Sequence, residues 1–221
     1  MKMKRKVAVI HTFLYSVEDL KKLFKEKLPE VEMINIIDDS LLQEALKNKG
    51  VTPGIIKRIC AYAVEAETMG CECILNQCSS VGEASEVAQK LINIPYVKID
   101  GPMAEKAVTL GSNIAVIATA ISTMGPSSRL VENTAKRMNK EVNVEQCFCE
   151  GAYEALLIEN DREKHNRIVI DRIKEAAKKN DVIVLAQGSM YQLLPLLTDV
   201  KIPVLTSLES GVEQIRKVLN L

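Results

Sequence analysis

The sequence of 221 residues repeats itself at a separation of about half its length. Three segments return in the same order, 107 to 110 positions later: Val7–Thr12 as Ile114–Thr119, Ile74–Ser80 as Val184–Met190, and Asn93–Pro95 as Lys201–Pro203. A constant order and separation indicate a duplicated half. Such a chain should form two similar halves related by a pseudo-two-fold axis. We expect its site where the halves meet, with one copy of each loop on either side.

Short apolar runs alternate with helical patterns along both halves. Val7–His11 is a β-branched run of the kind found in buried parallel strands, and Thr52 with Pro53 is typical of a helix start. The predicted strands are 7–11, 31–37, 71–75, 96–99, 113–118, 142–147, 182–186 and 203–206. The predicted helices begin near residue 16 and at 52, and then cover 82–91, 103–110, 127–139, 153–158, 162–179, 191–197 and 208–221. Strict alternation predicts an α/β fold with parallel sheets, and ligands then bind beyond the carboxyl ends of the strands.

The composition argues against several classes of function. Net charge is zero, which disfavours binding to nucleic acid or to a membrane surface, and only 4% of residues are aromatic. A small polar ligand fits this composition better than a base or a sugar. No apolar run approaches the ~20 residues of a membrane span, and none follows the basic start as a signal peptide would require. We therefore expect a cytoplasmic protein with its six cysteines reduced.

Hydroxyl side chains follow the strand ends in both halves. They are Thr12, Ser79, Ser80, Thr119, Ser122, Thr123 and Ser189. Free backbone amides at the starts of the next helices favour anions, and amides combined with hydroxyls suit a carboxylate. Phosphate is disfavoured because the chain contains neither glycine-rich phosphate motif. The alternative is that these residues only cap helices.

Cys78 stands where a strand gives way to a helix start, a position that favours a reactive thiolate able to act as base or nucleophile. The alternative is a small buried side chain, and we expect that role for Cys60, Cys71, Cys73, Cys147 and Cys149. The two Cys-x-Cys pairs raise a metal site as a rival, although structural zinc sites use Cys-x-x-Cys.

The two histidines receive different expectations. His11 ends the first strand, where it could orient a substrate or move a proton, or simply be a polar residue at a strand end. His165 lies in the charged run Asp161–His165, which we interpret as a solvated helix face.

With these motifs the chain resembles the aspartate/glutamate/hydantoin racemase superfamily. The resemblance covers nearly the whole chain and is carried by Asn76–Ser80 with Ile94-Pro95, Ile114–Thr119, Glu150–Leu156 and Leu185–Met190. It implies two Rossmann-like lobes, one of residues 1–100 plus 208–221 and the other of residues 101–207. It also implies a small carboxylate substrate in the cleft between lobes, neither pyridoxal phosphate nor a metal, and a homodimer or higher homo-oligomer. Relatives include amino-acid and hydantoin racemases, maleate isomerase and arylmalonate decarboxylase.

The resemblance also assigns roles. Racemases of the family place two cysteines on opposite sides of the substrate, and Cys78 matches the first, whereas Gly188 stands at the second position. We expect Cys78 as acid/base and substrate contacts from the hydroxyl residues together with Gln187. A single thiol fits decarboxylase, lyase or isomerase chemistry better than two-base racemisation. The rival from another class is a non-catalytic carboxylate-binding protein, or a thiol-ligated metal protein.

Overall fold

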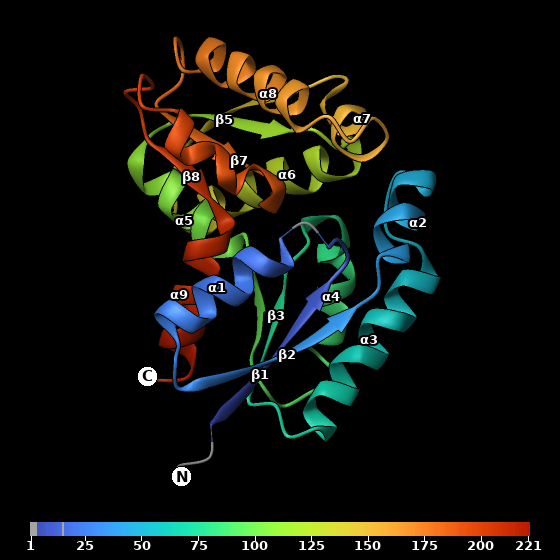
Figure 1. Ribbon diagram of the computed structural model, residues 1–221. Coiled ribbons are helices and arrows are strands. Elements are labelled where there is room, and N and C mark those ends of the chain that lie inside the picture. The colour runs from blue at the N-terminus through green and yellow to red at the C-terminus, as the bar shows by residue number, and fades with distance from the viewer. Residues whose placement is uncertain (1–3, 15) are drawn as a thin grey trace. The chain divides into compact units, whose positions relative to one another are not determined.

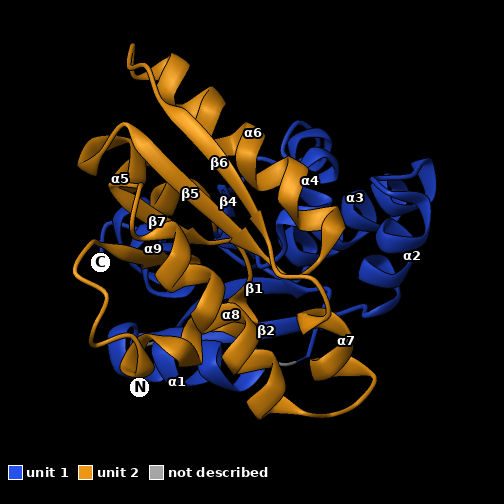
Figure 2. Cartoon of the chain, turned by 90° about the horizontal axis from the view of Figure 1, so that it is seen from above, with its two compact units in different colours: residues 1–99, 208–221 blue, residues 100–207 orange. Residues whose placement is uncertain are grey.

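The computed structural model describes residues 4–14 and 16–221, and its chain divides into two units. Unit 1 is Met1–Ile99 with Leu208–Leu221, and unit 2 is Asp100–Ser207. Figure 2 colours the two units separately. Each unit is built on a four-stranded sheet.

Unit 1 has a parallel sheet with the strand order β2-β1-β3-β4. Its elements are β1 (Arg5–His11), α1 (Val17–Lys27), β2 (Val31–Ile37), α2 (Ser40–Asn48), α3 (Pro53–Thr68), β3 (Cys73–Asn76), the 3-10 helix η1 (Ser79–Val81), α4 (Gly82–Ala88), β4 (Tyr96–Lys98) and α9 (Ser207–Val218). Every residue from Val7 to His11 is buried, as expected of a central strand covered on both faces.

The two faces of the unit 1 sheet are covered by different helices. Ala8, Ile10 and Ile74 share a core with residues of α2, α3 and α4. Figure 1 shows α1 and α9 on the other side of this sheet, where Lys27 of α1 forms an ion pair with Glu213 of α9 at 3.2 Å. Alternate residues of β1 therefore point towards different helix layers.

Unit 2 repeats this arrangement with the strand order β6-β5-β7-β8, again parallel. Its elements are α5 (Gly101–Leu110), β5 (Asn113–Ala118), α6 (Ile121–Arg137), β6 (Asn143–Phe148), α7 (Ala152–Leu157), α8 (Arg162–Ala176), β7 (Val182–Leu185), the 3-10 helix η2 (Gly188–Leu196) and β8 (Val204–Thr206). Ile114 and Val116 pack with α5 and α6, whereas Ala115 and Ile117 pack with α7 and α8. The predicted α/β class with two similar parallel-sheet lobes is confirmed.

Some boundaries differ from those predicted. Helix α2 was not predicted, although its Leu41, Leu42 and Ala45 are buried. Helix α6 begins at Ile121 rather than at the predicted residue 127. Pro126 instead lies within the helix, which continues without the bond that an N–H at this position would donate.

The segments after β3 and β7 are also less regular than predicted. Helix α4 ends at Ala88 instead of residue 91, and it is preceded by η1. The segment predicted as a helix over 191–197 is the 3-10 helix η2, which begins earlier, at Gly188.

Candidate functional site

The loop that carries Cys78 is held by the end of strand β3. Asn76 Nδ2 donates to the backbone oxygen of Cys78 at 2.9 Å, and the N–H of Val81 donates to the same oxygen at 3.4 Å. Cys78 itself has an extended backbone and is the residue immediately before η1. The sequence therefore places a half-buried thiol at the point where a buried strand turns into a short helix. Asn76, to which sequence reasoning gave no role, shapes this turn.

The other predicted residues of unit 1 lie beside this loop or at the neighbouring strand end. Ser79 and Ser80 are the first residues of η1, and Ser80 is buried. Thr12 follows β1 directly and is buried, and its Oγ1 has no hydrogen-bond partner among the described residues. Gln77 Nε2 lies 2.6 Å from Ser16 Oγ, which ties the loop to the start of α1.

In unit 2 the residues at the equivalent strand ends bond to one another. Gln187 Oε1 accepts from the backbone N–H of Thr119 at 2.6 Å, from its hydroxyl at 3.0 Å, and from the N–H of Ala120 at 3.3 Å. The structure thus brings Thr119 and Gln187 together. The side-chain oxygen of Gln187, which follows β7, binds the residues that precede α6. This bonding was not predicted from the sequence.

The remaining predicted residues of unit 2 lie at helix starts. Ser122 and Thr123 are buried in the first turn of α6, and Ser189 is buried in η2. Gly188 begins η2 and is half-buried. Among the described residues the glycines with positive φ are Gly70 and Gly151. Gly188 is not one of them, so a left-handed backbone is not the reason for a glycine at this position.

Four of the other cysteines, Cys71, Cys73, Cys147 and Cys149, are buried as expected, whereas Cys60 is half-buried like Cys78. Burial raises the pKa of Cys73 and of Cys149 to about 12, and that of Cys147 to about 11. It also raises the pKa of Cys60 and Cys71. These thiols stay protonated near neutral pH, and a thiol is a much weaker nucleophile than a thiolate. Within residues 4–14 and 16–221 no group of three or more His, Cys, Asp or Glu side chains is arranged to hold a metal.

Both histidines are buried. His11 is 0% exposed, and its Nε2 lies 3.0 Å from Asn35 Oδ1 of β2. Burial is the main cause that lowers the pKa of His11, and the charge of Lys21 lowers it further against the opposing effect of the Asn35 bond. His165 is also 0% exposed, so our interpretation of a solvated face was wrong. His165 begins the buried stripe of α8 that continues with Val169, Ile173 and Ala176, and this spacing is the signal that could have revealed it.

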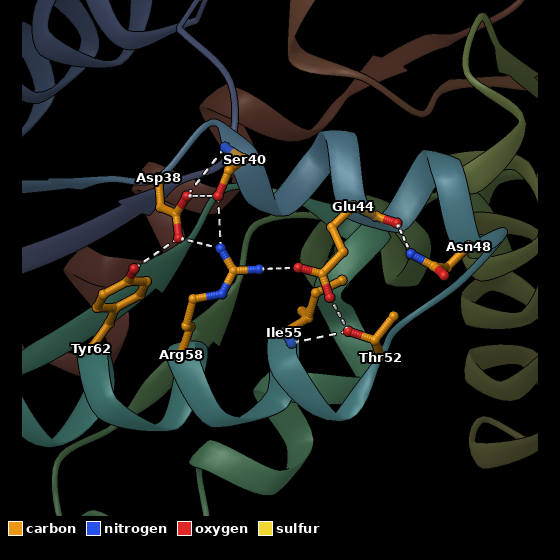
Figure 3. A network of polar contacts seen from close by, with 8 residues as sticks. All are labelled: Asp38, Ser40, Glu44, Asn48, Thr52, Ile55, Arg58 and Tyr62. Carbon is orange, nitrogen blue, oxygen red and sulfur yellow. Dashed lines mark hydrogen bonds and ion pairs between the residues drawn. The ribbon is translucent and has the colours of Figure 1, made fainter.

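A polar network anchors the unpredicted helix α2, as Figure 3 shows. Arg58 of α3 forms an ion pair with Asp38 at 2.9 Å and another with Glu44, and the Tyr62 hydroxyl donates to Asp38 at 2.7 Å. Burial alone would raise the pKa of Asp38, but hydrogen bonds from Ser40 and Tyr62 and the charge of Arg58 outweigh it and hold that pKa below its usual value.

Helix α2 matters for the site because it packs beside the Cys78 loop. Its Leu41 and Ala45 share a core with Val81 and Ala84, and Cys78 packs against the same core. The ion pairs of Arg58 hold α2 in place, and α2 contributes to the core against which Cys78 packs.

The comparisons with known proteins agree with this description. The family model of Asp/Glu/Hydantoin racemase matches residues 16–215, so the chain belongs to this family. No match was found among curated proteins. A glutamate racemase isoform from Bacillus anthracis superposes with a TM-score of 0.75 at 15% identity, covering 99% of this chain and 82% of that one.

Two further solved structures resemble the chain. An allantoin racemase from Klebsiella pneumoniae has a TM-score of 0.70 at 16% identity, covering 98% of this chain and 88% of that one. An aspartate racemase from Picrophilus torridus has a TM-score of 0.73 at 13% identity, covering 98% of this chain and 94% of that one. At these identities the likeness shows the fold. None of the helices among the described residues has both the length and the apolar character needed to span a membrane.

Proposed function

We propose that the protein is a cofactor-independent, racemase-like enzyme acting at the carbon next to the carboxylate of a small amino acid or dicarboxylate. Membership of the racemase family supports an isomerase of this kind. The observation that carries the proposal is the position of Cys78, a half-buried thiol on a loop fixed by Asn76 between β3 and η1. In the proposed role, Cys78 is the acid/base.

The proposed chemistry needs only proton transfers. The Cys78 thiolate removes the proton from the carbon next to the carboxylate, the electron pair moves into the carboxylate, and an enediolate with a neutral thiol results. Returning a proton to the same carbon completes the cycle. Hydroxyls and backbone amides would stabilise the negative charge that develops on the carboxylate oxygens. The proposed contacts are Thr12, Ser79, Ser80, Thr119, Ser122, Thr123, Gln187 and Ser189.

A second candidate function is favoured by Gly188. The sequence repeat makes Gly188 the counterpart of Cys78, and glycine has no group that transfers a proton. An enzyme with one thiol delivers its proton to one side of the substrate. A decarboxylase, lyase or cis-trans isomerase needs no second thiol, and we propose these as the alternative reactions.

Solvent-deuterium exchange tests the proposal without knowledge of the substrate. The protein is incubated in D₂O with dicarboxylates, α-amino acids and hydantoins, and the carbon next to the carboxyl or carbonyl group is followed by proton NMR. Racemisation gives deuterium in both enantiomers, whereas one-sided chemistry gives a single stereoisomer or a new product. Binding of a carboxylate without any exchange or new product would instead identify a non-catalytic binding protein.

A further inference from the structure

Two buried acceptor atoms without partners lie at neighbouring strand ends in unit 1. They are His11 Nδ1 and Gln77 Oε1, neither of which has a hydrogen-bond partner among the described residues. Strands β1 and β3 are parallel, with Val9 opposite Leu75 and Ile10 opposite Asn76. The next pair in this register is His11 and Gln77. Neighbouring strands are about 4.8 Å apart, so the two side chains are within reach of each other if they share a face.

The two side chains do share a face. Ile10 packs with the core of α2, α3 and α4, and side chains alternate along a strand, so His11 points to the opposite face. Gln77 follows Asn76, the partner of Ile10, and it too points away from that core. The bond of Gln77 to Ser16, the residue immediately before α1, agrees with this, because α1 lies on the other side of the sheet (Figure 1).

The tautomer of His11 makes its Nδ1 an acceptor. With the Asn35 amide oriented so that its Oδ1 lies 3.0 Å from His11 Nε2, Nε2 carries the hydrogen, because an amide oxygen only accepts hydrogen bonds. In the neutral ring Nδ1 then has a lone pair. The register and the shared face therefore bring two acceptors, His11 Nδ1 and Gln77 Oε1, to neighbouring positions without partners, although buried polar atoms in folded proteins almost always have partners.

A half-turn of the Gln77 amide removes this conflict, because it exchanges the positions of the nitrogen and the oxygen. We propose that Gln77 Nε2 donates to His11 Nδ1 while Gln77 Oε1 accepts from the Ser16 hydroxyl. Ser16, Gln77, His11 and Asn35 then form a continuous chain of hydrogen bonds. His11 is thus a positioning residue. It is fully buried, and it holds the side chain of the residue that precedes Cys78.

NMR tests the hydrogen bond directly. In uniformly ¹⁵N-labelled protein, we expect a scalar coupling between the Gln77 side-chain nitrogen and His11 Nδ1, which only an N–H···N bond transmits. We also expect the Nδ1 chemical shift of an unprotonated nitrogen. A hydrogen on Nδ1, or no coupling because a water molecule bridges the two side chains, would overturn the proposal.

Two matched variants test the positioning of the loop. In His11→Asn the amide oxygen can take the place of Nδ1 and accept from Gln77, whereas in His11→Gln the longer side chain reaches the Nε2 position towards Asn35. We expect Cys78 to react with iodoacetamide about fivefold faster in His11→Gln than in His11→Asn, the equivalent of one net hydrogen bond. His11→Asn should react like the wild type.

Urea unfolding of both variants controls for the general cost of replacing a buried ring. Equal alkylation rates in the two variants would overturn the positioning role. A fold defect in either variant leaves the NMR test of the wild type decisive. Both readouts are independent of turnover. Only the consequence for catalysis rests on the proposed function. Failure of the hydrogen bond between His11 and Gln77 is therefore distinguishable from failure of the proposed function.

Discussion

Thr119 and Gln187 are joined twice at the strand ends of unit 2, where Gln187 Oε1 accepts from the backbone N–H of Thr119 at 2.6 Å and from its hydroxyl at 3.0 Å. The repeat places Thr12 and Gln77 at the same positions in unit 1. There Thr12 Oγ1 has no partner among the described residues, and Gln77 reaches Ser16 instead. The two copies therefore share a backbone arrangement but use their strand ends differently.

This difference predicts that Gln187 contributes to stability. Gln187→Met removes the acceptor from two backbone N–H groups and one hydroxyl of unit 2. We expect a loss of about 1–3 kcal/mol in the free energy of unfolding, measured with urea, because the buried donors lose their partner. A loss below about 0.5 kcal/mol, the usual scale of an inconsequential surface change, would show that these bonds are not needed for the fold.

Cys78 should be the first thiol to react with an alkylating reagent. Burial raises the pKa of each of the other five cysteines, so few of them are thiolates near neutral pH. Brief treatment with iodoacetamide at about pH 7, followed by peptide mapping, should label the peptide with Cys78 before any other. Prior labelling of Cys147 or Cys149 would contradict the assignment.

Gly188 should control the type of reaction. Gly188→Cys supplies a second thiol at the position that the repeat equates with Cys78, and a well-placed acid/base contributes about 10²-fold or more. We expect the Gly188→Cys variant to create or increase racemisation of a small α-substituted carboxylic acid. The reaction is measured by polarimetry.

Gly188→Ala is the matched control, because it adds a side chain without an acid or base. If both variants impair binding or folding equally, Gly188 is required for space rather than for its missing thiol. Efficient racemisation by the wild type, with deuterium entering both enantiomers, would show that another residue supplies the second proton.

The buried His165 should make the protein less stable in weak acid. Burial, together with the charge of Arg162, lowers the pKa of His165 against the opposing effect of its Asn166 bond. The unfolded imidazole binds a proton below pH about 6.5, while the folded one stays neutral. The free energy of unfolding therefore has its full value above pH about 6.5. Below that pH it falls by up to about 1.4 kcal/mol per pH unit for each such histidine, until the pH reaches the lowered pKa of the folded state.

His165→Gln tests this dependence, because its amide does not titrate. The free energy of unfolding in urea is compared between about pH 7.5 and pH 5.5, and the variant should lose less stability than the wild type. His11 has a lowered pKa for the same main reason, so the variant should keep part of the slope. Identical slopes in wild type and variant would show that His165 is not neutral and buried as described.

The sequence predicted the architecture well where the signal is a buried run. The β-branched Val7–His11 and its repeat Asn113–Ala118 were both recognised as strands, and both are central in their sheets. Short amphipathic elements were less predictable. Helix α2 has only nine residues, and it is held by Arg58, which lies on another helix and leaves no local signal.

The site was only partly predictable for the same reason. The position of Cys78 after a buried strand followed from Ile74–Ser80, because an apolar run that ends in small polar residues marks a strand end. The bonds from Gln187 to Thr119, and from His11 to Asn35, join residues far apart in the chain. Such partners depend on strand order and on which face a side chain occupies, which residue spacing does not specify. His165 shows the opposite error, since its charged neighbours concealed a buried helix position.

Cys78→Ala removes the thiol to which we assign the proton transfer. The measurement is the rate of solvent-deuterium incorporation next to the carboxylate in the best substrate of the panel, alongside the thermal midpoint. We predict that incorporation falls to the uncatalysed rate while the midpoint shifts by no more than about 2–4 °C, because a half-buried thiol contributes about 1 kcal/mol or less. Incorporation by Cys78→Ala at a rate close to that of the wild type would show that Cys78 is not the acid/base.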